Sequence, residues 1–162
     1  MLGGIGHALV PAVEEAVFFH TIARNTQPEY VIKGQSPITE SYSAIGPEVL
    51  QDARGAPVAE KSRRFIDVLV EFDALVIAGE AKSHCVAWTI EDLLSQILLE
   101  DPELAKKVYL LEDCTSAVVV PGVVDYTLEA EKAYQKSSEA GMHVVRSTEP
   151  IPNWPGIGEN LD

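Results

Sequence analysis

The chain has 162 residues with a formal net charge of −13, and 46% of its residues are hydrophobic and 23% charged. These values exclude a disordered or fibrous protein and allow one folded domain, residues 1–162, whose core needs no disulfide. The acidic surplus argues against a nucleic-acid or membrane partner, because either surface would require clustered Lys and Arg. No apolar run reaches the roughly 18 residues that span a bilayer and no signal peptide opens the chain, so we expect a cytoplasmic protein.

Apolar spacing and the positions of Pro and Gly predict alternating helices and strands along the chain. The predicted elements of the first half are a helix over 10–24, a strand over 30–32, a short helix over 47–52 within a loop over 35–57, and a helix over 58–71. Those of the second half are a strand over 74–78, a helix from about Cys85 to 100, a strand over 108–111, a helix over 127–140 and a strand over 143–145. Gly141 is expected to cap the last helix in a left-handed conformation, and the tail beyond 145 is expected to be irregular.

Strands that alternate with helices through short connections predict a parallel sheet flanked by helices. The expected fold class is therefore α/β, a three-layer sandwich around a sheet of four strands. Because Met1 leads directly into a Gly-rich loop over 3–6, we expect this sheet to lack the first strand of a complete fold, with the N-terminal part of the domain missing.

Three reactive side chains follow predicted strands. Lys33 ends one strand, the segment 79–85 ends the next, and Asp113 ends the third. Ligands of open parallel sheets bind at the carboxyl ends of the strands, so these groups are expected to converge. A cysteine at a helix N-terminus has its thiolate stabilised by the helix dipole, and a nearby ammonium adds to that effect. The chemistry that this pattern predicts is acyl transfer to the sulfur of Cys85, followed by hydrolysis.

Two segments, Ile32-Lys33-Gly34 and Gly79-Glu80-Ala81-Lys82-Ser83-His84-Cys85-Val86-Ala87-Trp88-Thr89, resemble the lysine and cysteine motifs of the isochorismatase-like cysteine hydrolases. The resemblance covers most of the chain, and the cysteine motif is its most specific part. The nicotinamidase-like branch is the nearest match, with residues 3–15 corresponding to the loop and helix that follow its Trp-Pro-x-His-Cys segment. The reaction that this resemblance implies is hydrolysis of a C–N amide bond in a small molecule such as nicotinamide, through a thioester.

The resemblance also assigns roles to individual residues. Cys85 is the catalytic nucleophile and Lys33 its catalytic partner. A cis peptide joins Glu80 to Ala81, and the amides of Ala81 and Cys85 form the oxyanion hole. Substrate-binding roles fall to Tyr42, Glu80 and Trp88. The family's catalytic Asp, and the Asp and His residues through which nicotinamidases bind a divalent metal, belong to upstream positions that this chain does not contain. No cofactor or metal is therefore assigned within it.

Other polar residues have simpler interpretations. His84 is expected to pack or cap rather than act as a base, because neighbours at a helix start point in different directions. Asp113 is expected to hold loop backbone rather than replace the missing Asp, and Cys114 to be structural. His7 and His20 lack companions at metal-ligand spacing, so they are not assigned to a metal.

Two further functions stay open. The chain could be a catalytically inactive relative or an assembly module that keeps the fold, or a hydrolase of isochorismate-like ethers. Family members commonly form homo-oligomers, and an oligomer of undefined number is expected here.

Overall fold

The computed structural model describes residues 4–157. The chain divides into two compact units, Met1–Val31 and Ile32–Asp162. Each unit is described by itself, and the prediction of a single domain stays a prediction. Among the described residues, no helix combines the length and apolarity that crossing a membrane requires.

The first unit consists mainly of helix α1, Pro11–Arg24, which confirms the helix predicted over 10–24. Pro11 occupies the first turn, where its missing N–H costs no helical hydrogen bond. Asn25 ends the helix in a left-handed conformation with φ of 48°. Phe18 and Phe19 meet edge to face and are both exposed, so the apolar face of α1 is not buried within this unit.

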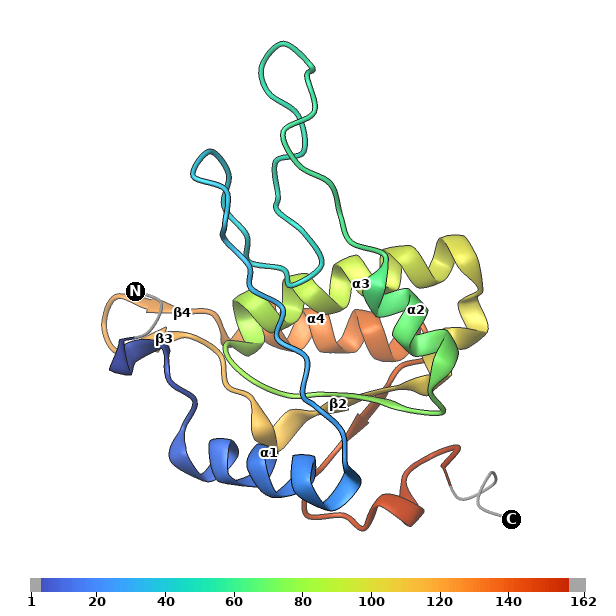
Figure 1. The fold of residues 1–162 in the computed structure, drawn as a ribbon. Coiled ribbons are helices and arrows are strands. Elements are labelled where there is room, and N and C mark those ends of the chain that lie inside the picture. Colours follow the sequence, from blue (N-terminus) through green and yellow to red (C-terminus); the bar gives the residue numbers. More distant parts are fainter. Residues whose placement is uncertain (1–3, 158–162) are drawn as a thin grey trace. The chain divides into compact units, whose positions relative to one another are not determined.

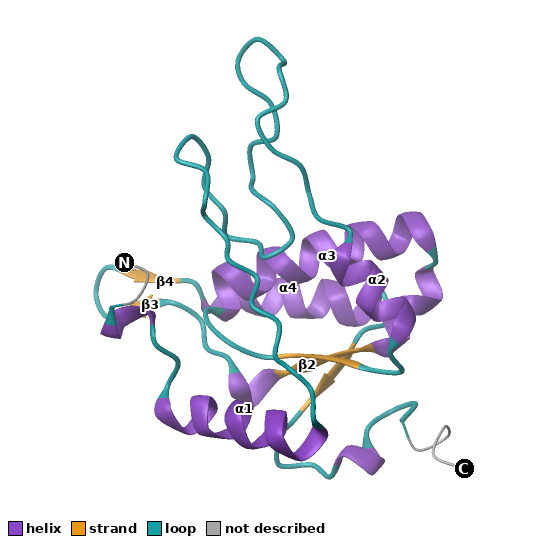
Figure 2. Cartoon of the chain, viewed as in Figure 1, coloured by secondary structure: helices purple, strands orange, loops and turns teal. Residues whose placement is uncertain are grey.

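A parallel sheet forms the centre of the second unit (Figures 1 and 2). Its strands are β1 (Leu75–Ile77), β2 (Val108–Leu111) and β5 (His143–Val145), in the order β1-β2-β5. These match three of the four predicted strands. The prediction of a strand over 30–32 is wrong, because these residues are exposed and belong to no described strand. A three-residue apolar run becomes a strand only where a sheet edge accepts its backbone hydrogen bonds.

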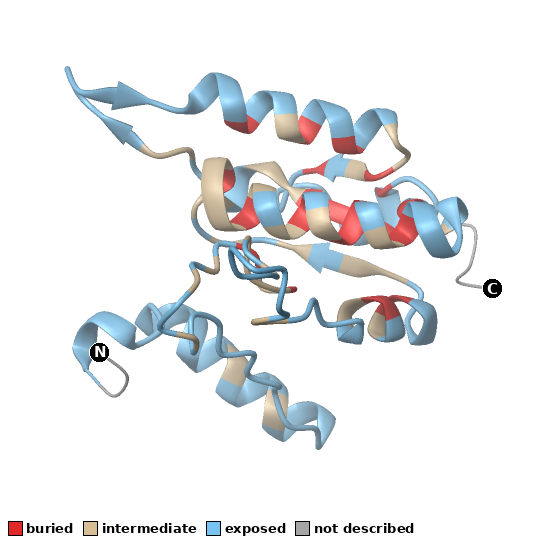
Figure 3. Cartoon of the chain, turned by 90° about the horizontal axis from the view of Figure 1, so that it is seen from above, coloured by how far each residue is buried: buried red, intermediate tan, exposed pale blue. Residues whose placement is uncertain are grey.

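Three helices pack together with the sheet: α2 (Arg64–Glu71), α3 (Ala87–Glu100) and α4 (Thr127–Glu139). Their buried residues share one hydrophobic core with β2, as the red positions in Figure 3 illustrate. The centre of this core includes Leu93, Ile97, Val108, Leu110 and Met142. Gly141 has φ of 106° after α4, in agreement with its predicted role at the helix end.

Two helix predictions fail in the long loop that precedes α2. The helix expected over 58–71 begins only at Arg64. The short helix expected over 47–52 is absent, and a bridge between Gln51 and Pro57 closes a turn instead. Asp52 explains this difference, because its carboxylate accepts hydrogen bonds from the backbone N–H groups of Arg54 (2.8 Å) and Ala56 (2.9 Å). Asp favours such turns over helix interiors.

The other face of the sheet carries a smaller cluster. Tyr109 stacks on Trp154 with ring centroids 5.5 Å apart, and its hydroxyl donates to the carbonyl of Pro155 at 2.6 Å. Burial raises the pKa of Tyr109. The tail predicted as irregular thus contributes a buried tryptophan and a short 3-10 helix, Ile151–Asn153.

A hairpin that the sequence analysis missed connects the sheet to α4. It pairs β3 (Val119–Val120) with β4 (Val124–Asp125) in antiparallel fashion. Gly122 supplies the positive φ of 75° that its tight turn requires.

Candidate active site

Cys85 lies in a turn at the carboxyl end of β1. After β1 the chain passes Gly79, whose φ is 126°, and then the cis peptide between Glu80 and Ala81 that the resemblance implied. Lys82–Val86 form a π-helical turn that leads directly into α3. Cys85 is a free, partly exposed thiol within this turn, which we call the nucleophile turn (residues 79–86). Its position agrees with the prediction that a helix begins near Cys85.

Hydrogen bonds join the nucleophile turn to the segment 114–118, which follows β2. The backbone N–H of Gly79 donates to the carbonyl of Cys114 at 3.1 Å, and that of Lys82 donates to the carbonyl of Ser116 at 2.8 Å. Ser83 accepts through its hydroxyl from the N–H of Val118 at 3.0 Å. The first half of the turn, residues 79–83, is therefore held by this one segment.

Glu80 takes part in the same attachment. Its carboxylate accepts from the backbone N–H of Ser116 at 3.2 Å and from the Ser116 hydroxyl at 3.0 and 3.1 Å. Its substrate-binding role stays a prediction, since these contacts give Glu80 a structural partner. Within the turn, the Ala81 carbonyl accepts from the N–H groups of His84 (3.0 Å) and Val86 (3.1 Å). The oxyanion-hole role of the Ala81 and Cys85 amides likewise stays a prediction.

Aromatic side chains gather beside the nucleophile turn. Tyr42 and Trp88, both predicted to bind substrate, lie with ring centroids 6.0 Å apart and are 41% and 43% exposed. Tyr42 also approaches His84 at 5.9 Å, and His84 meets Tyr126 edge to face at 4.8 Å. His84 further contacts the Ser83 hydroxyl at 2.8 Å, so the prediction that it packs is confirmed. Tyr126 was missed, although an aromatic residue directly before a predicted helix offered a signal.

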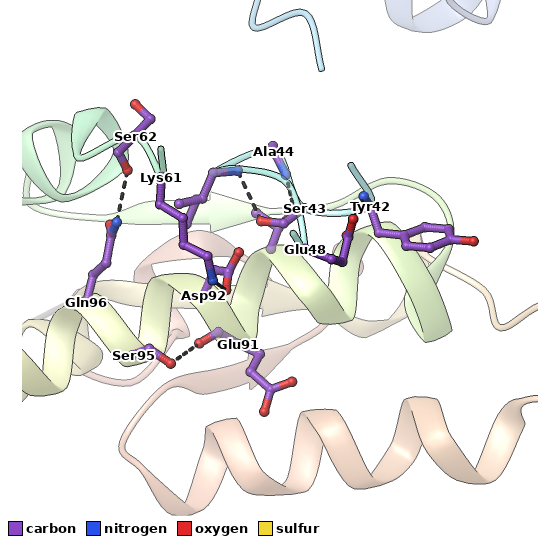
Figure 4. Close-up of polar contacts among 12 residues, drawn as sticks. Tyr42, Ser43, Ala44, Glu48, Lys61, Ser62, Glu91, Asp92, Ser95 and Gln96 are labelled. Carbon is purple, nitrogen blue, oxygen red and sulfur yellow. Dashed lines mark hydrogen bonds and ion pairs between the residues drawn. The ribbon is translucent and has the colours of Figure 1, made fainter. Parts of the chain in front are cut away.

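The loop that carries Tyr42 is bound along α3 (Figure 4). The N–H of Ala44 donates to the Thr89 hydroxyl at 3.0 Å, and that hydroxyl donates to the Cys85 carbonyl at 2.7 Å. The N–H of Tyr42 donates to Glu48 at 2.7 Å, which fixes the start of the loop. Ser43 is buried between these contacts. Thr89 therefore couples the Tyr42 loop directly to the residue that bears the thiol.

The far end of this loop is attached one and two turns further along the helix. Lys61 pairs with Asp92, and the Gln96 amide donates to the Ser62 carbonyl at 2.9 Å (Figure 4). Residues 42–62 thus meet α3 at both of their ends.

Lys33 is exposed, and its ammonium donates to the carbonyl of Tyr42. Among the residues that the structure describes, no hydrogen bond joins this ammonium to the sulfur of Cys85. The lysine is thus connected to the nucleophile turn through the Tyr42 loop, and its support of the thiolate stays a prediction.

Lys82 is a site residue that the sequence analysis did not single out. Its side chain is only 9% exposed, and its ammonium pairs with Glu131 of α4 at 2.6 Å. The same ammonium lies 4.3 Å from the ring centroid of Tyr134. Burial raises the pKa of Tyr134 to about 12; the neighbouring Thr115 hydroxyl acts in the opposite direction, but neither hydroxyl has a partner in hydrogen-bonding geometry. A lysine in a polar turn gives no sequence signal of burial.

Asp113 has the role predicted for it. Its carboxylate accepts from the backbone N–H and from the hydroxyl of Ser147, each at 2.8 Å, and these bonds lower its pKa. Cys114, His7 and His20 are exposed. Within residues 4–157, no group of three or more His, Cys, Asp or Glu side chains is arranged to hold a metal ion. These residues do not form the metal site that nicotinamidase resemblance implies.

No family model matches the chain, and no curated protein matches it. Among solved structures, the yeast nicotinamidase bound to the inhibitor nicotinaldehyde is similar over 89% of this chain and 55% of its own, with 19% sequence identity and a TM-score of 0.53. The Pyrococcus horikoshii pyrazinamidase in complex with zinc is similar over 75% of this chain and 54% of its own, with 20% identity and a TM-score of 0.45. The Acinetobacter baumanii nicotinamidase pyrazinamidase is similar over 76% and 60%, with 19% identity and a TM-score of 0.39.

The likeness to the yeast structure concerns the fold. It confirms the predicted α/β class, with helices around a parallel sheet as in the yeast nicotinamidase structure. The chain spans only 54 to 60% of the length of these three structures.

Proposed function

We propose that this chain supplies the nucleophile and part of the substrate site of a cysteine hydrolase that cleaves the C–N amide bond of a small planar molecule such as nicotinamide. The observation that carries the proposal is the position of Cys85. Cys85 is partly exposed in a turn at the carboxyl end of β1 and at the start of α3. The residue before it, His84, lies 5.9 Å from the ring of Tyr42, which in turn lies 6.0 Å from the ring of Trp88. Thiols at helix N-termini are favoured as thiolates, and strand ends of this kind are where open α/β sheets bind ligands.

The proposed reaction begins when the Cys85 thiolate attacks the amide carbonyl carbon. The oxyanion that forms accepts hydrogen bonds from the amides of Ala81 and Cys85, which lowers the barrier by a few kcal/mol. The C–N bond then breaks, and the nitrogen leaves as ammonia after taking up a proton. Water adds to the thioester, the carboxylic acid departs and the thiol is restored. Lys33 supports the thiolate and the departing amine.

Proton transfer in this scheme is not assigned to the chain's own carboxylates near the turn. Asp113 is held by Ser147, and Glu80 by Ser116. The family resemblance gives this step to an aspartate outside the present residues. No step is assigned to a metal ion, because the described residues do not fit one.

We propose a planar substrate because of the aromatic rings of Tyr42 and Trp88. Tyr42 and Trp88, whose rings lie 6.0 Å apart, each leave about two-fifths of their surface exposed. Aromatic rings bind flat heterocycles by offset stacking, which contributes about 0.5–1.5 kcal/mol beyond burial. We also propose that the chain forms a homo-oligomer and that it is located in the cytoplasm.

Alkylation of Cys85 by iodoacetamide at neutral pH tests the nucleophile, with Cys114 as an internal reference in the same peptide map. We expect Cys85 to react faster than Cys114, although Cys114 is the more exposed thiol. Nicotinaldehyde, which the yeast nicotinamidase structure contains, is expected to protect Cys85, because a thiolate adds to an aldehyde carbonyl without a leaving group. Acetaldehyde at equal concentration controls for aldehyde chemistry without the ring. A Cys85 that reacts no faster than Cys114 and gains no protection refutes the proposal.

Ammonia release from nicotinamide, measured against Cys85→Ala, tests turnover. A reactive Cys85 without turnover supports the assignment of the proton step to a group outside the chain. An unreactive Cys85 without turnover favours the inactive relative or assembly module.

A further inference from the structure

The nucleophile turn contains a buried charge that the proposed chemistry does not use. Lys82 lies three residues before Cys85, and its side chain is 9% exposed. Its ammonium contacts a carboxylate and an aromatic face of α4, through Glu131 at 2.6 Å and Tyr134 at 4.3 Å. Lysine is among the residues least often buried, and it is almost never fully buried unless it is paired. This lysine is therefore held by two groups of one helix.

The two ends of Lys82 bind different parts of the fold. Its backbone N–H donates to the Ser116 carbonyl in the segment after β2, while its ammonium reaches α4. The two attachments restrain the turn at different points, because Ser116 binds the backbone of Lys82 and Glu131 binds the end of its long side chain. Cys85 belongs to the same five-residue turn, Lys82–Val86. Its orientation therefore depends on both attachments.

Stability alone gives a weak reason for a lysine at this position. Only the lysine of this pair is buried, because the Glu131 side chain is 61% exposed. Removing an ammonium from water costs several kcal/mol, and apolar residues of similar volume often replace buried charged groups that are paired without loss. Methionine would fill the same space and keep contact with the Tyr134 ring. What methionine cannot provide is a directional bond to Glu131. The ion pair thus contributes orientation that packing does not supply.

We propose that Lys82 is a positioning residue for Cys85, which holds the nucleophile turn against α4 through Glu131 and Tyr134. The inference rests on the proposed function, because orientation of the turn matters only if the thiol reacts. It predicts that loss of the bond leaves the fold intact but displaces the thiol relative to the helix start and to the rings of Tyr42 and Trp88. A misplacement of about 1 Å can cost on the order of 100-fold in rate.

The test compares Lys82→Met, Lys82→Arg and Glu131→Gln with the wild-type chain. The matched control is Lys136→Met, which removes another lysine–glutamate pair between α4 and α3, with Glu91, away from the nucleophile turn. The main measurement is the rate of Cys85 alkylation relative to that of Cys114, by mass spectrometry. Thermal unfolding by circular dichroism reports the fold, and hydrogen exchange of the 82–86 amides reports the turn.

We expect Lys82→Met to slow Cys85 alkylation by roughly 10- to 100-fold and to speed exchange of the turn amides, with unfolding still cooperative. Glu131→Gln should lie between it and the wild type. Lys82→Arg should restore most of the rate, because Arg keeps the charge and the contact with the ring. Lys136→Met should leave the rate unchanged.

Two results separate this inference from the proposed function. A wild-type Cys85 that does not react overturns the proposed function, and this inference with it. A reactive wild type whose Cys85 rate is unchanged in Lys82→Met overturns this inference alone, as does an equal loss in Lys136→Met.

Discussion

The hydroxyl of Thr89 connects the Tyr42 loop to the nucleophile turn by hydrogen bonds. The substitution Thr89→Val removes this hydroxyl with little change in the shape of the side chain. In the wild type this one group accepts from the Ala44 N–H at 3.0 Å and donates to the Cys85 carbonyl at 2.7 Å. The partners of the hydroxyl are 45 and 4 residues away in sequence. Valine therefore tests a tertiary contact and a local one together.

The expected loss of stability follows from the groups left behind. The partly buried Ala44 N–H loses its acceptor, which costs about 1–3 kcal/mol. The carbonyl of Cys85 also loses one of its donors. Because helix α3 follows Cys85 almost directly, we expect this second loss to add only about 0.5–1 kcal/mol to the cost. We therefore expect the free energy of unfolding to fall by about 1.5–4 kcal/mol, measured by urea unfolding with far-UV circular dichroism. Release of the loop should also raise quenching of Trp88 by acrylamide, while Trp154, at 5% exposure, stays protected.

Ser95→Ala is the matched control for this substitution. Ser95 lies on the same helix and donates to the Glu91 carbonyl at 2.8 Å, but it is exposed and holds no loop. We expect its free energy of unfolding to stay within about 0.5 kcal/mol of the wild type. If Thr89→Val unfolds like Ser95→Ala and Trp88 quenching does not change, the Tyr42 loop is not held by Thr89 and the description of the site is wrong.

Three further substitutions test the core and two polar groups. Leu93→Ala removes a fully buried side chain of α3 and should lower the free energy of unfolding by about 2–5 kcal/mol in urea; a loss below about 1 kcal/mol would mean that α3 does not form the core. Tyr134→Phe removes a buried hydroxyl without a partner, so stability at pH 7 should be unchanged or higher by up to about 1 kcal/mol. The folded chain keeps Tyr134 protonated up to about pH 12, whereas the unfolded chain releases this proton near the ordinary pKa of 10.0. The wild type should therefore lose stability as the pH rises through this window, and the variant should lose less. Equal dependence of the unfolding free energy on alkaline pH in the two proteins would contradict this. Ser147→Ala removes one of the two Ser147 hydrogen bonds that lower the pKa of Asp113, so that pKa should rise toward its ordinary value in an NMR titration, and no upward shift would contradict the assignment.

The sequence predicts the sheet and α3 well for a physical reason. The strands over 74–78 and 108–111 are unbroken apolar runs, as buried parallel strands require. The stripe from Val86 to Leu98 has the helical period, and it is buried as expected up to Ile97, whereas Leu98 is 54% exposed. In β2 and along most of α3 burial follows the local pattern, whereas Val76 of β1 is 44% exposed although its run is equally apolar.

The failures lie where distant partners decide the structure. The run over 30–32 has strand-like residues but is assigned to no strand. Pro121-Gly122 between valines was a readable turn signal for the β3–β4 hairpin. Lys82 gave no such signal, because its burial depends on Glu131, which lies 49 residues away. The position of Cys85 at the start of α3 could be predicted from its motif, but the attachments that hold its turn could not.

The arrangement around Cys85 separates two requirements of amide hydrolysis. Addition of the thiolate to a carbonyl needs the thiol, a ring surface and oxyanion donors, and all of these are assigned to residues of this chain. Expulsion of the amine also needs a proton at the leaving nitrogen, and the carboxylates of Glu80 and Asp113 near the turn are already bound by Ser116 and Ser147. The proposed function therefore implies that the chain forms an adduct with a planar aldehyde more readily than it turns over the corresponding amide. A chain that hydrolyses nicotinamide efficiently yet forms no adduct with nicotinaldehyde would contradict this division of roles.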